Sequence, residues 1–230
     1  ADIINYVSKH DGEALWDKLQ YSLATSRTSE ERVRVQNISL ALPMLSQGIP
    51  FLQIGGDLLR SKSMDRNSYD SGDWFNKVDF TKTENNWNVG LPLAQDNESK
   101  WSTMLPIVEN SETAVSAAQI VLAGDVFNEF VKIRSSSKLF RLNTSQDVYD
   151  RVGFHNTGTN QVKGLIVMSI DDGTGFTDLD PNNDAFVIMI NGSDIEQSYT
   201  VPTATGFELH SVQMNSQDDQ VKLATFVAGT

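Results

Sequence analysis

Hydrophobic residues in the first half of the chain follow two patterns. The runs Ile3–Val7 and Ile49–Ile54 are short and mostly apolar, which is typical of strands buried inside a parallel sheet. Between them, Glu13–Ala24 and Ser29–Ser46 carry apolar residues at helical spacing. This order of strand, loop, helix and strand predicts a parallel βα repeat.

Polar stretches of sequence separate the second predicted helix from the elements that follow it. Ser29 is the predicted cap of the second helix, although Arg32 stands where a capping box would have Glu. The stretch Asp57–Asn97 is long, polar and without sustained periodicity, and its aromatic residues argue against disorder. A further helix is predicted over Glu112–Arg134.

Beyond about Ser137 the pattern changes to short apolar or alternating runs separated by turn residues. We expect strands at Val148–Phe154, Gly164–Ile170, Ala185–Ile190, Phe207–Val212 and Val221–Val227. Strands of this length and spacing are typical of an antiparallel β-sandwich. The predicted fold class is therefore multidomain, with an α/β part over residues 1–137 and an all-β domain over residues 138–230.

Charge and composition narrow the classes of function. The 230 residues carry a formal net charge of -12, so a nucleic-acid partner is not expected. No cysteine is present, which excludes disulfides, thiolate metal sites and a cysteine nucleophile. No stretch approaches the roughly 20 apolar residues that span a bilayer, so no transmembrane segment is predicted.

The first residues suggest how the chain relates to a larger protein. Ala1–Val7 opens at once as an apolar strand, without Met and without a basic leader. A single strand of this kind normally has parallel neighbours, so we expect a chain cut from something larger. A mature protein after removal of a signal peptide is the alternative.

Two loops contain residues that could carry chemistry. Val7–Asp11 follows the first predicted strand, where α/β barrels place their active sites, and His10 beside Asp11 could bind sugar hydroxyls. The alternative is an ordinary loop in which Asp11 caps the helix that begins near Glu13.

Leu58–Asn76, after the second strand, mixes Arg, Asp, Asn, Tyr and Trp. Sugar sites use this mixture, because planar polar groups bind hydroxyl pairs and aromatic faces pack on the pyranose ring. The alternative is a solvated loop pinned by Arg–Asp pairs.

Other candidates are weaker. The acidic runs Asp171–Gly173 and Asp178–Asp184 lack the spacing of a calcium-binding EF-hand loop, so we interpret them as turns between strands. His155 and His210 are isolated in the sequence, and we expect Trp16 to pack in the core.

Four motifs in the first half resemble the pullulanase form of glycoside hydrolase family thirteen. They are Ile4–Asp11, Gln47–Phe51 with Leu58–Ser63, Arg66–Asn76 and Asn88–Pro92, in the family's order. The resemblance implies that residues 1–137 are the last part of a (β/α)8 barrel, with strands seven and eight. The later region, for instance Gly164–Gly173, resembles the family's C-terminal domain more loosely.

The resemblance also implies a chemistry. These enzymes are retaining glycosidases that act on α-1,6 branch linkages with a nucleophile, a general acid and a third carboxylate. Asp11 matches the third carboxylate and His10 its neighbour, whereas the nucleophile and the acid would lie upstream. Sugars further from the cleaved bond would contact Arg66 and Asn67, within a binding loop that also contains Asp65, Tyr69, Asp73 and Trp74.

Three positions depart from the family pattern: Gly12 stands where Asn is usual, Asp57 where Glu is common, and Asn67 where Asp is common. The last replaces a charged contact by a neutral one.

Other functions stay open at this point. An isoamylase-like or α-1,4-cleaving relative, a carbohydrate-binding module and a purely structural cap are the alternatives. No cofactor is expected in this chain, and calcium is left open for the full-length enzyme. The expected partners are an α-glucan and the upstream part of the same enzyme, and the expected location is secreted or on the surface of a bacterium.

Overall fold

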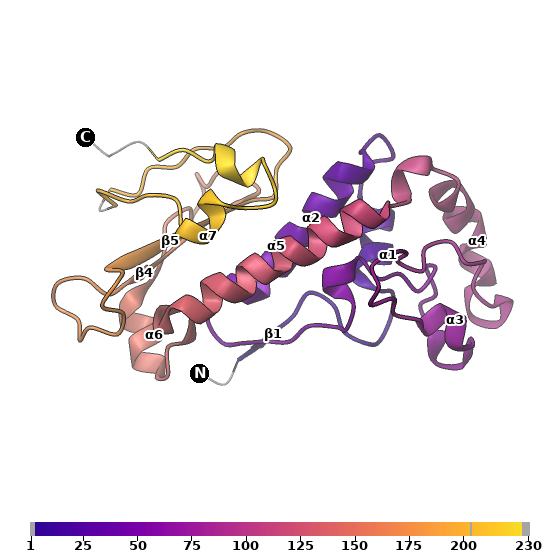
Figure 1. The fold of residues 1–230 in the computed structure, drawn as a ribbon, viewed down its shortest axis with the longest axis horizontal. Helices are drawn as coiled ribbons and strands as arrows, with labels where there is room; N and C mark the ends of the chain where they lie inside the picture. The colour runs from indigo at the N-terminus through magenta and orange to yellow at the C-terminus, as the bar shows by residue number, and fades with distance from the viewer. Residues whose placement is uncertain (1–2, 203, 227–230) are drawn as a thin grey trace. The chain divides into compact units, whose positions relative to one another are not determined.

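The computed structural model describes residues 3–202 and 204–226, which belong to two compact units (Figure 1). The helical unit comprises Tyr6–Leu40 and Phe51–Phe127. The sheet unit comprises Ala1–Asn5, Ala41–Pro50 and Asn128–Thr230. Two long helices, α2 (Ser29–Leu45) and α5 (Ala117–Ser136), contribute residues to both units.

The helical unit has a small apolar core. Besides α2 and α5 it contains α1 (Leu15–Ser22), α3 (Asp73–Asn76), α4 (Ala94–Val108) and the 3-10 turns η1 (Gly56–Leu58), η2 (Ser68–Asp70) and η3 (Ser111–Thr113). Its core cluster consists of Trp16, Val33, Leu58, Leu59, Ile120 and Ala123. Trp16 is fully buried, which confirms it as a core residue. Full burial of one large apolar side chain stabilises a fold by about 1.5–3 kcal/mol.

The start of α2 is capped one residue earlier than the sequence pattern suggested. The Thr28 amide donates to the Glu31 carboxylate over 2.8 Å, and the Glu31 amide donates to Thr28 Oγ1 over 3.2 Å. This reciprocal pair is a capping box, so the prediction of Ser29 as the cap was wrong. Arg32 is instead buried, where its guanidinium donates to the Gln20 side chain and to backbone carbonyls.

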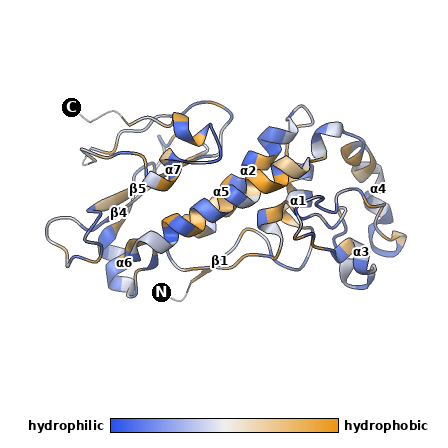
Figure 2. Cartoon of the chain, viewed as in Figure 1, coloured by the Kyte–Doolittle hydropathy of each residue, from blue (hydrophilic) through white to orange (hydrophobic). Residues whose placement is uncertain are grey.

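Helix α5 is a core helix of this fold. The helical stretch Ser111–Ser136 is long and apolar enough to cross a membrane by length and composition alone, a test that core helices also pass. Hydrophobic and hydrophilic residues alternate along it (Figure 2). In the sheet unit, its Glu129 accepts hydrogen bonds from Ser216 and Gln217, and its Arg134 donates to three carbonyls at the end of α2. These polar contacts belong to a folded interior rather than to lipid.

Two short parallel strands open the sheet unit. β1 (Ile4–Asn5) pairs with β2 (Ile49–Pro50), with Ile4 opposite Ile49, which confirms the predicted parallel sense. The prediction that both strands are buried was wrong for this chain, because Ile4 is 57% and Ile49 55% exposed. Among the described residues no third strand pairs with either of them, so each has one edge without a strand partner.

An antiparallel sheet follows in the same unit. After η4 (Lys138–Arg141) and α6 (Ser145–Arg151) come β3 (Val152–Phe154), β4 (Leu165–Asp171) and β5 (Ala185–Asn191), in that spatial order. The long pairing of β4 with β5 runs from Leu165 opposite Asn191 to Asp171 opposite Ala185 (Figure 1). The predicted strands at 164–170 and 185–190 are therefore confirmed.

The other three predicted strands need correction. Residues 145–151 form α6, so only the end of the run Val148–Phe154 is a strand. The run Phe207–Val212 leads into the short helix α7 (Ser211–Met214), and Val221–Leu223 form the 3-10 turn η5. Val227, the last residue of the final run, lies outside the described residues. Several apolar residues of these runs are exposed, Tyr149 at 85% and Leu223 at 68%, so their hydrophobicity did not mark strands buried in a sheet.

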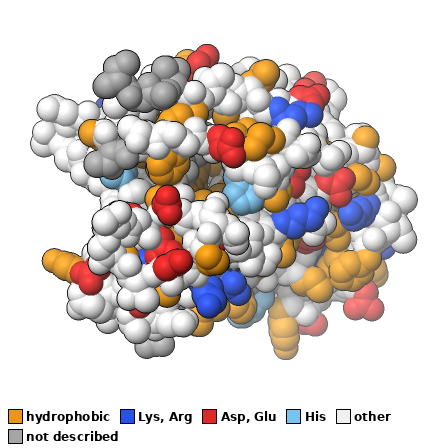
Figure 3. Space-filling view, turned by 60° about the vertical axis from the view of Figure 1, so that its left-hand side comes forward, with side chains coloured by type: hydrophobic (Ala, Val, Ile, Leu, Met, Phe, Trp, Pro, Cys, Tyr) orange, Lys and Arg blue, Asp and Glu red, His pale blue; other side chains and the backbone are white. Residues whose placement is uncertain are grey.

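In the described part of the chain, the predicted architecture is incomplete. It contains the two parallel strands that were expected, but one antiparallel sheet rather than the two sheets of a sandwich. The proposed boundary between residues 137 and 138 stays a prediction. Acidic side chains are spread among hydrophobic ones on the face drawn in Figure 3, as the net charge of -12 leads one to expect.

Candidate functional site

The loop after β1 presents an exposed acidic group. The Asp11 carboxylate accepts a hydrogen bond from Lys9 Nζ over 2.8 Å, and its other oxygen lies 3.4 Å from His10 Nε2. The side chains of His10 and Asp11 are 85% and 66% exposed. The Lys9 hydrogen bond, with the nearby charges of His10, Lys9 and Lys62, lowers the pKa of Asp11 below its usual value. The carboxylate is thus held ionised and open to solvent.

The structure contradicts the alternative in which Asp11 caps the following helix, α1. The residue before α1 is Ala14, and no side chain makes a capping hydrogen bond at this helix end. Asp11 therefore accepts no capping hydrogen bond from an amide of α1.

Replacing Lys9 with methionine should move the pKa of Asp11 upward. Methionine keeps the apolar stem but removes both the hydrogen bond and the charge, and that hydrogen bond is the largest cause of the lowered pKa. A group with a lowered pKa keeps its charge to lower pH, so the variant should become protonated earlier as the pH falls. NMR titration of the Asp11 carboxyl carbon measures the shift. An unchanged pKa would mean that Lys9 does not hold this carboxylate.

The second loop is organised around Asp65. This side chain is fully buried, and its carboxylate accepts from the Asn67 amide over 2.8 Å and from Ser71 Oγ over 2.5 Å. Asn97 Nδ2, on α4, lies 3.2 Å from the same carboxylate. With its oxygens engaged inside the protein, Asp65 shapes the loop in this structure rather than presenting its charge at the surface.

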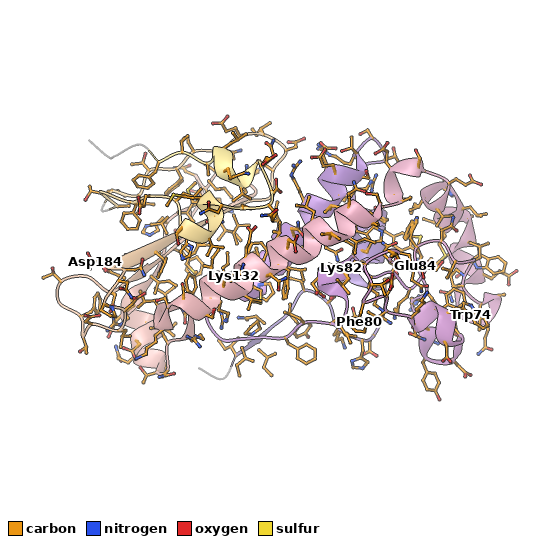
Figure 4. The ribbon with its side chains drawn as sticks, in the orientation of Figure 1. Trp74, Phe80, Lys82, Glu84, Lys132 and Asp184 are labelled. Atoms are coloured by element: carbon orange, nitrogen blue, oxygen red, sulfur yellow. The ribbon has the colours of Figure 1, made fainter. Side chains whose placement is uncertain are left out.

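The other predicted binding residues of this loop are exposed. They are Arg66, Asn67, Tyr69, Asp73 and Trp74. Trp74, on α3, is labelled in Figure 4. It is 60% exposed, and Tyr69 in η2 is 92% exposed. The Trp74 ring lies over Gly72, where a Cβ would come within 3.1 Å of it, so this position favours glycine. The exposed Trp74 ring, which packs on Gly72, is an apolar surface of the kind on which a sugar ring can pack.

Both loops lie in the helical unit, and a buried lysine acts on both. Lys62 is only 3% exposed, and burial lowers its pKa. Its charge interacts with Asp17 and Asp65 and also lowers the pKa of Asp11. Lys62 thus interacts electrostatically with Asp11 of the first loop and with the buried Asp65 of the second.

The family of this chain follows from a match to a known family model. Residues 82–230 match the family described as "Alpha-1,6-glucosidases, pullulanase-type, C-terminal". The chain belongs to the pullulanase-type α-1,6-glucosidases.

Relatives across most of the chain carry the same family name. It is 40% identical to "Pullulanase 1, chloroplastic" of Arabidopsis thaliana, over 98% of this chain and 24% of the relative. It is 38% identical to the pullulanase of Klebsiella pneumoniae, over 96% of this chain and 20% of that protein. The chain thus spans about a quarter or less of these relatives.

A solved structure supports the same conclusion. The structure described as Klebsiella pneumoniae pullulanase complexed with maltotriose matches with a TM-score of 0.87 and 41% identity, over 92% of this chain and 20% of that chain. The resemblance seen in the motifs is therefore confirmed at the level of the family. Because one relative is named chloroplastic, membership does not support a secreted location in particular.

The sequence motifs did not identify several residues that are structurally important in this pullulanase-type chain. Asp17, Asn85 and Asn97 are buried, and their side chains form hydrogen bonds to Ser61, Leu59 and Asp65 of the second loop. The sequence offers one signal for the first of them: Asp17 directly follows the core residue Trp16 in a helix where the polar Gln20 is also buried.

The remaining candidates have local partners. His155 Nε2 lies 2.8 Å from Ser169 Oγ, and His210 packs against Phe186, with its pKa lowered by burial. Within residues 3–202 and 204–226, no group of three His, Cys, Asp or Glu side chains gathers closely enough to hold a metal ion.

Proposed function

We propose that this chain is the C-terminal part of a retaining glycoside hydrolase that cleaves α-1,6-glucosidic linkages in pullulan, amylopectin or limit dextrins. One observation carries the proposal. The exposed pair His10–Asp11 lies in the same compact unit as the exposed Arg66–Trp74 segment, and both have the sequence motifs of the pullulanase family.

Asp11 acts on the sugar at the cleaved bond. Its carboxylate accepts hydrogen bonds from the 2- and 3-hydroxyls, which tighten as the ring flattens towards an oxocarbenium ion. The low pKa of Asp11 supports this role, because the charge must be present when positive charge develops on the sugar. His10 donates to the same hydroxyls from its exposed ring.

The second loop binds sugars further from the cleaved bond. Arg66 and Asn67 offer planar donors that match vicinal hydroxyls, and Trp74 and Tyr69 offer exposed aromatic faces. Asp73 completes the exposed polar set, whereas Asp65 holds the loop from inside.

The rest of the active site belongs to the upstream part of the same enzyme. β1 and β2 act as strands seven and eight of its barrel. Their unpaired edges receive the neighbouring strands, and the exposed Ile4 and Ile49 side chains are covered by the rest of the barrel. The antiparallel sheet of β3, β4 and β5 forms part of a C-terminal sandwich. A retaining mechanism needs a nucleophile and an acid about 5 Å apart, which this upstream part supplies.

Hydrolysis of pullulan by the enzyme that contains this chain tests the proposal. New reducing ends should appear, and linkage analysis should show that α-1,6 bonds disappear while α-1,4 bonds remain. The 230-residue chain by itself should release no reducing sugar. Loss of α-1,4 bonds would favour an α-amylase-like activity, and hydrolysis by the isolated chain would contradict the assigned roles.

A further inference from the structure

The loop that leads into the predicted sugar contacts has a strained backbone. Leu59, Ser63 and Met64 adopt positive φ angles of 56°, 52° and 65°, although none is glycine. All three are buried. Such conformations are unfavourable for residues other than glycine and persist only where the surroundings determine them strongly. Something in the helical unit must therefore hold this loop.

Asp17 holds it from one side. One carboxylate oxygen accepts from Ser61 Oγ over 2.5 Å, and the other accepts from the Lys62 amide over 2.8 Å. Ser61 Oγ in turn accepts from the Ser63 amide over 2.8 Å. Asp17 is fully buried on α1, about 45 positions away in sequence from the loop it holds.

Two asparagines hold the loop from the other side. The Ser61 amide donates to the Asn85 carbonyl over 2.8 Å, and Asn85 Nδ2 donates to the Leu59 carbonyl over 2.9 Å. Asn86 Nδ2 donates to the carbonyls of Ser61 and Trp74 over 3.4 and 2.6 Å. The chain then passes directly into Asp65 and its hydrogen bond to the Asn67 amide.

We propose that Asp17 is a positioning residue for glucan binding, whose carboxylate keeps Ser61–Met64 in the strained conformation that sets Arg66 and Asn67. The inference rests on the proposed function, because it assigns sugar contacts to those two residues. Asp17 itself is buried and touches no substrate.

The protonation state of Asp17 makes its proposed effect on binding depend on pH, whereas an effect of packing alone would not depend on pH. A carboxylate can accept with both oxygens, whereas a protonated carboxyl, like the amide of asparagine, presents one acceptor and one donor group. Burial, the largest cause, raises the pKa of Asp17 to about 6, partly offset by its hydrogen bonds and by the charge of Lys62. Arg60 and Tyr21 also face it. As the pH falls through this value, native Asp17 takes up a proton.

Asp17→Asn in the enzyme that contains this chain is the decisive variant. At pH 7.5 we expect KM for pullulan to rise about tenfold with kcat nearly unchanged, the size of effect that loss of a charged hydrogen bond produces. At pH 5 the ratio of variant to native KM should fall towards one, because native Asp17 is then protonated too. A ratio that stays the same at both pH values would overturn the inference.

Two further variants serve as controls for misfolding and for the loss of a carboxylate charge elsewhere in the chain. Asp150→Asn makes the same chemical change at an exposed carboxylate that accepts from Gln146 on α6, in the sheet unit, and it should leave KM unchanged. Ser61→Ala removes one donor to Asp17 but leaves the carboxylate in place, so KM should rise at pH 7.5. If Asp17→Asn does not fold, a normal KM in Ser61→Ala would overturn the inference.

Amide hydrogen exchange separates this inference from the proposed activity. At pH 7.5 the Lys62, Ser63 and Asn67 amides should exchange faster in Asp17→Asn than in the native protein, after correction for the intrinsic rate. This holds whether or not the enzyme cleaves pullulan. An enzyme inactive on pullulan would refute the proposed function, whereas unchanged exchange would refute the positioning role.

Discussion

Replacing Asp11 with asparagine should lower turnover on pullulan by on the order of 10² to 10³-fold, with a much smaller change in KM. The substitution keeps size and shape but removes the charge that the developing oxocarbenium ion requires. A group that acts mainly in the transition state lowers kcat more than ground-state binding. Steady-state kinetics of the enzyme that contains this chain measure both constants.

Arg66→Ala is the matched comparison for Asp11. Its exposed guanidinium is proposed to contact a sugar remote from the cleaved bond, so the variant should raise KM and reduce turnover only modestly. Because Asp11 makes no capping hydrogen bond to α1, Asp11→Asn should leave the melting temperature nearly unchanged. Near-normal turnover in a folded Asp11→Asn variant would show that Asp11 has no catalytic role.

Asp172→Ala should destabilise the sheet unit by about 3–5 kcal/mol. The side chains of Arg151 and Asp172 are 4% and 1% exposed, and they form a buried ion pair. Asp172 also accepts from the Leu179 and Asp180 amides over 2.8 Å each. Its removal leaves two amides without their acceptor, and it leaves the buried guanidinium with only backbone carbonyls and the Asp147 carboxylate, 3.4 Å away, which costs far more than loss of a surface pair.

Urea unfolding combined with hydrogen exchange of the β4 amides measures this effect. The matched control is Asp150→Ala, because Asp150 is exposed and accepts one hydrogen bond from Gln146 at the surface of α6. It should change stability by no more than about 0.5 kcal/mol. Equal stability of the two variants would mean that the Arg151 charge finds water or another partner.

Local patterns in the sequence were sufficient for the elements that bury one face. The spacing of apolar residues indicated α1, α2 and α5, and alternating or continuous apolar runs indicated β4 and β5. The same approach missed α4 (Ala94–Val108), whose buried residues include only Asn97 and Met104. A helix with so little apolar burial leaves a weak periodic signal. It also set the cap of α2 one residue late, although Thr28 and Glu31 have the spacing of a capping box.

The sequence alone determined the family and the two candidate loops, because ordered motifs of specific residues survive without knowledge of their contacts. Only the tertiary structure decided that Asp65 faces inward while Arg66 faces solvent, and that Asp17 holds the loop before them. The physical reason is distance along the chain. A strained loop owes its shape to hydrogen bonds from α1 and from Asn85, which local propensity cannot encode.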